Sequence, residues 1–290
     1  MIGQYVSYSA DGATVKFEKQ ITIYVGMNVD NGFNRYTLKY TANTPLKANV
    51  SYIYNGEKYC ETFFLEASDE LKSFKSFIDS YLTDGKAYGI EKFTFINTCE
   101  TECTLTMSNL ETELVPVLSK SMAYIENDTF CVGAFLAWGG GLSHIEFKED
   151  NPYGCCNLLN RYDAGRLVQQ SYYGIIHEPY HVETYMNNDW PYNPVQGGDQ
   201  FNNKSKLIDY RLTDTELYIK CRPRDWSKNG VFTDSYMENV YSLHGKYIRV
   251  DNRFVDFSGY QHDSNRQQKL PAFYTISALK KFSFYNGTKP

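Results

Sequence analysis

The sequence predicts an all-β protein made of two packed antiparallel β-sandwich domains. Its aromatic content is the first indication, because 26 tyrosines and 18 phenylalanines occur among 290 residues and both types favour half-buried pleated surfaces. Alternating apolar and polar runs, separated by Asp-Gly, Asn-Gly and glycine-rich turns, are the second. The length leaves room for two domains of usual size or one large all-β domain. A change of pattern near Cys131 favours two domains, residues 1–127 and 128–290.

The first domain is expected to be a sandwich of about seven or eight strands. Hairpins are predicted at the Asp-Gly of residues 11–12 and at the Asn-Gly of residues 55–56, because each dipeptide separates two alternating runs. Residues 68–82 are the one helix-like stretch, since apolar side chains recur near helical spacing and Ser68 suits an N-cap. An irregular pair of strands is the alternative, because Phe, Ile and Tyr serve either structure.

The second and larger sandwich is expected in residues 128–290. Residues 132–147 read as a strand, a glycine turn and a strand. Residues 207–223 and 240–257 each read as a hairpin with a polar turn near the middle. The last segment, residues 268–290, has the character of a strand that ends on a turn.

The charge and hydropathy of the chain exclude several classes of partner. The formal net charge is −5 and no sustained run of lysine or arginine occurs, so we expect no nucleic-acid binding. No stretch approaches the roughly 18 consecutive apolar residues that a membrane-spanning helix needs. The first residues lack the basic and apolar regions of a signal peptide. We therefore expect a cytoplasmic protein without membrane contact, or a secreted one if a leader has been removed.

The sequence gives no reason to expect a cofactor or a metal. Its seven cysteines are an odd number in a long chain, which indicates reduced thiols rather than a disulfide framework. Cys99 and Cys103 have no second cysteine pair to complete a zinc site. Residues 177–181 formally match the HExxH zinc motif, but Pro179 disfavours the helix that would place both histidines on one face.

Residues 137–199 concentrate paired polar groups, aromatic side chains and glycines more than any other part of the chain. Such a surface can hydrogen-bond and stack against a flat, hydroxylated molecule, and tyrosine offers a rigid ring with a polar tip. We therefore predict that this stretch forms a concave, solvent-facing site for carbohydrate. A structural role, in which the same groups are buried between sheets, is an alternative.

The first cluster in this stretch contains two arginines and an aspartate. Arg161 and Arg166 flank Asp163, and guanidinium groups so placed can clamp a uronate or hold the carboxylate ionised. An ion-pair network that fixes a loop would use the same residues. Successive side chains of an extended chain point to opposite faces. One member of each of the following pairs can therefore reach the site: Gln169 and Gln170, and Tyr172 and Tyr173.

The second cluster lies on a loop that two prolines stiffen, so its side chains are held without a large ordering cost on binding. Trp190 suits a sugar platform, or alternatively core packing. Asp199 suits an acid or base, or the cap of a turn. Tyr192 and Gln196 are expected to contact the ligand from the same loop.

Four motifs resemble those of a family of bacterial proteins of unassigned chemistry: NLLNRYDAGRLVQQSYYG, YNPVQGGD, LYIKCRPRDW and KLPAFYTI. The resemblance covers residues 130–290 well and the first part of the chain loosely. It implies a carbohydrate-module-like sandwich followed by a larger one, similar to the galactose-mutarotase-like supersandwich of polysaccharide lyases and some glycosidases. A supersandwich usually needs more residues than follow Cys131. The resemblance therefore implies a reduced form, or one whose sheets the first domain completes.

The leading functional hypothesis is an enzyme that cleaves an oligo- or polysaccharide, either a lyase or a glycoside hydrolase. A lyase needs a His or Tyr to remove the C5 proton and an Arg, Asn or Gln to neutralise the uronate, whereas a glycosidase needs two carboxylates. A non-catalytic glycan-binding protein is the alternative. The predicted catalytic residues are Asp163, Arg166, Tyr172, Asp199 and His262, and the predicted substrate-binding residues are Arg161, Gln170, Tyr173, Trp190, Tyr192 and Gln196.

Overall fold

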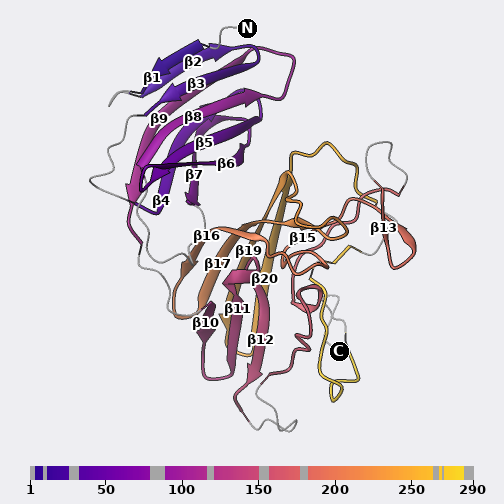
Figure 1. Cartoon of the computed structure of the whole chain (residues 1–290). Coiled ribbons are helices and arrows are strands. Elements are labelled where there is room, and N and C mark those ends of the chain that lie inside the picture. Colours follow the sequence, from indigo (N-terminus) through magenta and orange to yellow (C-terminus); the bar gives the residue numbers. More distant parts are fainter. Residues whose placement is uncertain are drawn as a thin grey trace. The chain divides into compact units, whose positions relative to one another are not determined.

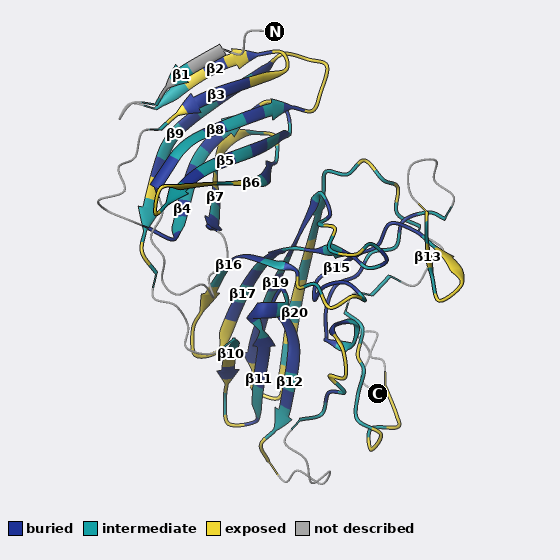
Figure 2. Cartoon of the chain, viewed as in Figure 1, coloured by how far each residue is buried: buried dark blue, intermediate teal, exposed yellow. Residues whose placement is uncertain are grey.

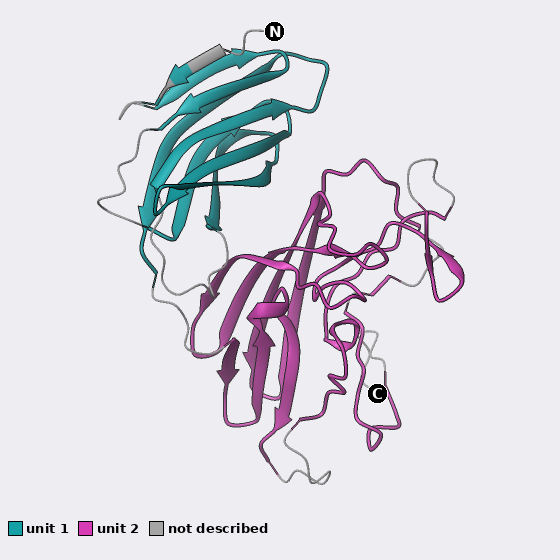
Figure 3. Cartoon of the chain, in the orientation of Figure 1, with its two compact units in different colours: residues 1–119 teal, residues 120–290 magenta. Residues whose placement is uncertain are grey.

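The computed structural model is all-β, as predicted, and divides into two compact units, Met1–Ser119 and Lys120–Pro290 (Figures 1 and 3). It describes residues 4–8, 12–25, 33–78, 89–115, 121–149, 157–176, 182–263, 268–269 and 271–283. No helix in these ranges is long and apolar enough to cross a membrane. The second unit begins before the expected boundary, because strand β10 (Met122–Glu126) forms a hairpin with β11 (Phe130–Phe135).

The described strands of the first unit form a β-sandwich of two sheets. One sheet has the order β1 (Gln4–Ser7), β3 (Gln20–Tyr24), β8 (Gly89–Asn97), β5 (Leu46–Tyr54) and β6 (Glu57–Leu65). The other has the order β2 (Ala13–Phe17), β9 (Cys103–Glu113), β4 (Arg35–Ala42) and β7 (Ser68–Phe77). Strand β1 pairs with β3 in parallel, and the other described pairings are antiparallel.

Aromatic rings from both sheets meet in the core of the first unit. Alternation along β4 buries Tyr36 and leaves its neighbours half-buried, as expected for a strand with one face on the core. Phe63 of β6 stacks on Phe74 of β7 with ring centroids 4.8 Å apart. Tyr36 contacts Phe93 of β8 at 5.8 Å. The high Phe and Tyr content is thus used to fill the space between two sheets.

The two hairpins predicted for the first unit have different outcomes. The turn at Asn55 and Gly56 is confirmed, and both residues have the positive φ values that a two-residue hairpin turn requires. The hairpin at residues 11–12 was wrong, because β1 and β2 belong to different sheets. Gly12 instead lets its strand approach β9 closely, since a Cβ there would lie 2.6 Å from the carbonyl oxygen of Met107.

The helix expected at residues 68–82 was also wrong over its described part. Residues 68–77 form strand β7, which pairs with β4 along its length. Phe74 and Phe77 are buried, whereas Leu71, which helical spacing placed on the same face, is 62% exposed. Pairing with a neighbouring strand therefore outweighed the local spacing of apolar residues.

A shared carboxylate links three strands of the first unit and makes its stability depend on pH. Glu113 accepts hydrogen bonds from Arg35 at 2.8 Å and is ion-paired with Lys75 at 2.9 Å. The bond from Arg35 outweighs burial and, together with Lys75, lowers the pKa of Glu113 from 4.5 to about 2. A carboxyl whose pKa falls on folding stabilises the fold above its unfolded pKa, and this contribution is lost as the pH falls from 4.5 towards 2.

We expect Glu113→Gln to flatten the loss of stability that the whole chain shows over this acidic range. Urea unfolding at a series of pH values measures the effect, since the slope of the unfolding free energy against pH reports differential proton binding. Arg35→Met should flatten the same range, because it removes the main cause of the lowered pKa. A Glu113→Gln protein with the full wild-type slope would contradict this account.

The second unit contains two main sheets and two small ones among its described residues. A three-stranded sheet has the order β10, β11 and β12 (Gly141–Phe147). A four-stranded sheet has the order β16 (Lys206–Leu212), β17 (Glu216–Arg222), β19 (Ser235–His244) and β20 (Tyr247–Asp256). The small sheets pair β13 (Glu183–Tyr185) with β14 (Asn188–Trp190), and β15 (Pro194–Val195) with β18 (Arg224–Asp225).

The expected turns of the second unit are mostly present. The hairpins β16–β17 and β19–β20 are confirmed. The predicted glycine turn is also present between β11 and β12, where it follows a 3-10 turn, η2 (Leu136–Trp138). A Cβ on Gly140 would lie 2.5 Å from the side chain of Ile219, and the Tyr241 hydroxyl donates to the Gly140 carbonyl at 3.2 Å. The turn therefore packs against the buried face of the four-stranded sheet (Figure 2). Residues 271–283 were expected to be strand-like but form an isolated bridge instead.

Candidate functional site

A pocket of about 240 Å³ lies in the second unit, where segments distant in sequence meet near β13 and β15 (Figure 1). It is smaller than the roughly 300–1,000 Å³ typical of sites for drug-sized ligands. Its lining consists of Asp163, Gly165, Arg166, Gln169, Ser171, Tyr173, Tyr185, Trp190, Asn193, Val195, Trp226, Lys269 and Tyr274.

Residues 157–176 form one side of the pocket as an extended segment that carries a single 3-10 turn, η3 (Ala164–Arg166). Gln169, which is buried, holds this turn in place. Its side-chain amide donates to the Ala164 carbonyl at 2.6 Å, and its carbonyl accepts from the Gly197 amide at 2.6 Å. A Cβ on Gly165 would lie 2.8 Å from the Trp226 ring, so glycine allows the turn to pack directly against that indole.

Four aromatic rings form a continuous wall along the pocket. Trp190 contacts Tyr173 edge to face at 5.6 Å and Tyr185 at 5.1 Å. Tyr185 in turn contacts Trp226 edge to face at 5.9 Å. The β13–β14 hairpin carries two of these rings, and its turn residues, 186–187, both have positive φ, which is uncommon for the methionine among them. These edge-to-face contacts are a favourable packing arrangement for aromatic rings.

The pocket lining carries two cations and one carboxylate. Arg166 lies 3.5 Å from Asp163, in a pair exposed enough to exchange partners. Lys269 donates to the Tyr274 hydroxyl at 3.3 Å, and its ammonium lies 6.0 Å from the centroid of Tyr173. Burial opposes the charge on Lys269, but the phenol oxygens of Tyr173 and Tyr274 more than compensate, so its pKa is raised. The lining is therefore net positive at neutral pH.

Four of the predicted site residues line this pocket, namely Asp163, Arg166, Tyr173 and Trp190. The structure thus brings Asp163 and Arg166 of the first cluster together with Trp190, which precedes the proline loop. Their chemical roles stay predictions. Tyr185, Trp226, Lys269 and Tyr274 complete the lining and were not among the predicted site residues.

Three other predicted residues are buried and engaged in hydrogen bonds that fix the loops around the pocket. Gln170 donates to the Glu238 carbonyl and the Asn239 side chain, both at 2.8 Å. Gln196 donates to the Gly139 carbonyl at 3.0 Å. Asp199 accepts four hydrogen bonds from its own loop and the neighbouring one. The proline loop, residues 191–199, is buried throughout. The expectation that this loop faces solvent was therefore wrong. Trp190, which precedes the loop, is half-buried.

Tyr172, Tyr192 and His262 belong to a separate aromatic cluster. The His262 ring lies 6.2 Å from Tyr172 and 6.0 Å from Tyr192, and its Nε2 contacts an Asp256 carboxylate oxygen at 2.9 Å. Burial raises the pKa of Tyr172 to about 12, and burial followed by the charge of Asp256 also raises the pKa of Tyr192. A raised pKa disfavours the deprotonated phenolate form, which a tyrosine needs in order to act as a base. None of the three residues lines the pocket.

Arg161 is exposed and lines a second, more apolar hollow of about 360 Å³. Asp163 lines both hollows, so the expected clamp of two arginines around one carboxylate is divided between them. The HExxH residues, 177–181, lie outside the described residues.

The proline-loop and arginine clusters could be found from sequence because their polar and aromatic residues lie close together in the chain. Lys269 and Tyr274 belong to the KLPAFYTI motif, which lies far along the chain from these clusters, so proximity in sequence did not join them to the site. An isolated bridge between Ser171 and Lys269 brings them to the pocket across 98 positions of sequence.

Comparison of the sequence with protein-family models and with curated proteins gave no match. The resemblance of residues 130–290 to a bacterial family therefore stays a prediction, and the pocket itself is the basis for a functional proposal.

Proposed function

We propose that this chain binds carbohydrate in the pocket of its second unit and that the ligand carries an acidic sugar, such as a uronate. The observation that supports this most directly is the wall of four aromatic rings beside two cationic side chains. Rigid rings give a sugar an apolar surface for its C–H faces, while charged and amide groups at the edge select its substituents.

The charges of the lining favour an acidic ligand over a neutral one. Arg166 presents a planar guanidinium, which matches a carboxylate in two-point geometry. Lys269 adds a second positive charge on a different segment of the chain. Among the described residues of the lining, Asp163 alone carries a carboxylate, and it already lies near Arg166, so it does not cancel both cations.

The number of carboxyl groups among the described lining residues also weighs against a glycoside hydrolase. Hydrolysis by the usual route requires two carboxyl groups that flank the scissile bond. Among the residues that line the described pocket, Asp163 alone carries one. Binding without hydrolysis is therefore the function that the lining supports best.

A polysaccharide lyase is the second candidate, and the contact between Lys269 and Tyr274 favours it. In such a reaction the phenolate of Tyr274 would remove the C5 proton of a uronate whose carboxylate Arg166 neutralises. The electron pair of that C–H bond would form the C4–C5 double bond as the bond from C4 to the departing oxygen breaks, and that oxygen would take up the proton from Tyr274 to leave as a hydroxyl group. The ammonium of Lys269 suits this role because it donates to the Tyr274 hydroxyl at 3.3 Å and so orients it.

A glycan panel separates these possibilities. Purified protein is expected to bind acidic oligosaccharides more tightly than neutral ones of the same length. Growth of ultraviolet absorbance from unsaturated uronate would identify the lyase, whereas new reducing ends without that absorbance would identify a hydrolase and contradict the proposal.

Arg166→Ala is expected to weaken binding of the acidic ligand by about tenfold, which corresponds to the loss of one charge-assisted contact. Arg211→Ala is the matched control, because Arg211 is stacked on Tyr218 as Arg166 is on Tyr162, but lies on the exposed end of β16. Equal affinities for wild type and Arg166→Ala would remove Arg166 from the site. A panel that shows no carbohydrate binding at all would overturn the proposed function.

A further inference from the structure

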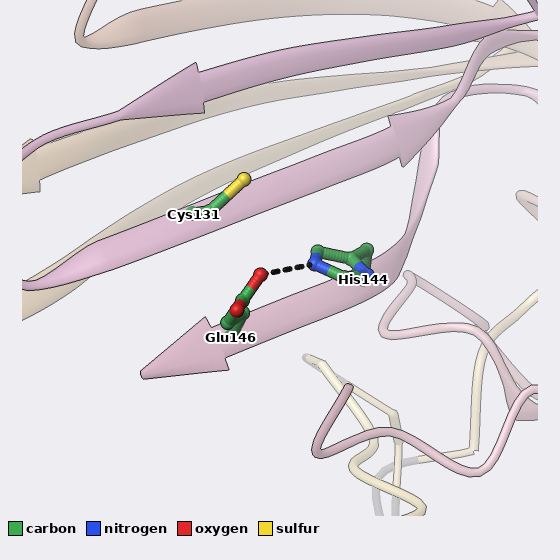
Figure 4. Close-up of side chains that lie close together, drawn as sticks. All are labelled: Cys131, His144 and Glu146. Carbon is green, nitrogen blue, oxygen red and sulfur yellow. Dashed lines mark hydrogen bonds and ion pairs between the residues drawn. The ribbon is translucent and has the colours of Figure 1, made fainter. Parts of the chain in front are cut away.

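A second cluster of reactive side chains lies on the three-stranded sheet of the second unit. Cys131 comes from β11, and His144 and Glu146 come from β12 (Figure 4). A ligand atom from each lies within 4.8 Å of the other two. None of the three lines the pocket described above. We propose that Cys131, His144 and Glu146 bind a divalent transition metal, with Zn²⁺ as the best match to their chemistry.

The register of the sheet places the three groups on one face. Cys131 and Glu146 are directly opposite one another on paired strands, and His144 precedes Glu146 by two residues. The intervening Ile145 is buried, so this side of the strand packs on the core while the three candidate ligands point the other way. A sequence reading of the cysteine spacing could not find the site, because its ligands adjoin only across the ladder.

The distances are close to those of an occupied site. The His144 Nε2 atom lies 3.4 Å from a carboxylate oxygen of Glu146. Around a tetrahedral zinc ion with its usual bond lengths, nitrogen, oxygen and sulfur ligands lie about 3.3 to 3.6 Å apart. The histidine and glutamate already satisfy this spacing, and the sulfur of the half-buried Cys131 lies within 4.8 Å of both ligand atoms. Thiolate, imidazole and carboxylate together are a donor set that zinc uses readily.

A glycine next to the cluster helps to orient the imidazole. Gly133 is the cross-strand partner of both Tyr124 and His144. A Cβ at Gly133 would lie 2.6 Å from the Tyr124 ring, so the absence of a side chain lets that ring lie across the strand. The ring contacts His144 edge to face with centroids 5.7 Å apart. The imidazole is thus supported by Tyr124 while its Nε2 is directed at Glu146 (Figure 4).

The charges around the cluster favour a cation. Glu126 is the cross-strand partner of Cys131 on the side opposite Glu146, so two carboxylates flank the thiol. Lys148 lies 3.4 Å from Glu126 and offsets part of this negative charge. Three protein ligands leave one tetrahedral position for water, the arrangement found in zinc sites that are open to solvent.

Metal titration of the full chain, reduced and freed of metal by a chelator, tests the proposal. Competition with a chromophoric chelator measures Zn²⁺ affinity, and the absorbance of bound Co²⁺ reports a thiolate ligand through its charge-transfer band. We expect wild type to bind one ion per chain with this band present. Cys131→Ser should abolish the band, and Cys131→Ser, His144→Gln and Glu146→Gln should each weaken Zn²⁺ binding by at least about tenfold.

Two controls make the result specific. Cys60→Ser removes an exposed thiol of the first unit and should leave the band and the affinity unchanged. The double variant His177→Gln/His181→Gln, whose positions lie outside the described residues, should also bind as wild type. Thermal unfolding of each metal-free variant shows whether it is folded, and the three ligand variants give independent tests if one is not.

No stoichiometric uptake of Zn²⁺ or Co²⁺ by wild type would overturn the proposal and leave His144 and Glu146 as a surface ion pair. Wild-type binding in all three ligand variants would overturn it as well. Loss of binding only in the His177→Gln/His181→Gln variant would place the metal at that motif instead. None of these outcomes depends on whether the chain binds carbohydrate.

Discussion

Asp199→Ala is expected to destabilise the second unit by at least about 3 kcal/mol, because it removes a buried acceptor of several hydrogen bonds. Its carboxylate, 1% exposed, accepts from the backbone amides of Phe201 and Asn203, each at 2.9 Å. It also accepts from the Asn203 side chain and the Gly230 amide, each at 2.8 Å. Alanine would leave these part-buried donors without the carboxylate that accepts from them, and an unsatisfied donor costs more than an average hydrogen bond contributes.

Chemical denaturation of the whole chain measures this effect. Asp199→Asn should cost less than Asp199→Ala, because it keeps one acceptor oxygen but replaces the other with a donor. Asp214→Ala, at an exposed turn of the same unit, is the control and should stay within about 0.5 kcal/mol of wild type. A stable Asp199→Ala protein that fails only in turnover of a sugar would instead support the catalytic role expected from the sequence.

Lys269→Met is expected to lower the affinity for an acidic oligosaccharide by about tenfold, the equivalent of 1.4 kcal/mol, and to leave affinity for a neutral one nearly unchanged. Lys269 is half-buried and its ammonium faces Tyr274 and Tyr173, so its charge is screened less than that of a surface lysine. Methionine keeps the length of the side chain and removes the charge. Calorimetric titration with matched acidic and neutral ligands measures both affinities.

Lys204→Met is the matched control, because Lys204 also lies beside an aromatic ring, 5.8 Å from that of Trp138, but is exposed and does not line the pocket. Added salt should weaken acidic-ligand binding to wild type more than to Lys269→Met. If Lys269→Met lowered both affinities equally, the lysine would contribute to the shape of the pocket rather than to selection of charge.

Much of the architecture follows from local sequence. Asn55 and Gly56 predict their hairpin because few other residues adopt the required φ values. Tyr and Phe in alternating runs predict sheets because the side-chain period of a strand is two. The same reasoning failed at residues 68–77, where aromatic spacing fits a helix in isolation. Pairing with β4 decided the outcome, and a partner more than 25 residues away leaves no trace in local spacing.

Part of the candidate site likewise follows from local sequence, and part of it depends on the tertiary structure. The sequence by itself determined that Asp163, Arg166, Tyr173 and Trp190 belong to one polar and aromatic region, because they lie within one stretch of chain. The tertiary structure alone decided that Lys269 joins them, because a bridge between extended segments is specified by backbone hydrogen bonds, which carry no residue signature. It also decided that loop 191–199 turns inward, since burial of polar side chains depends on hydrogen-bond partners that distant segments supply.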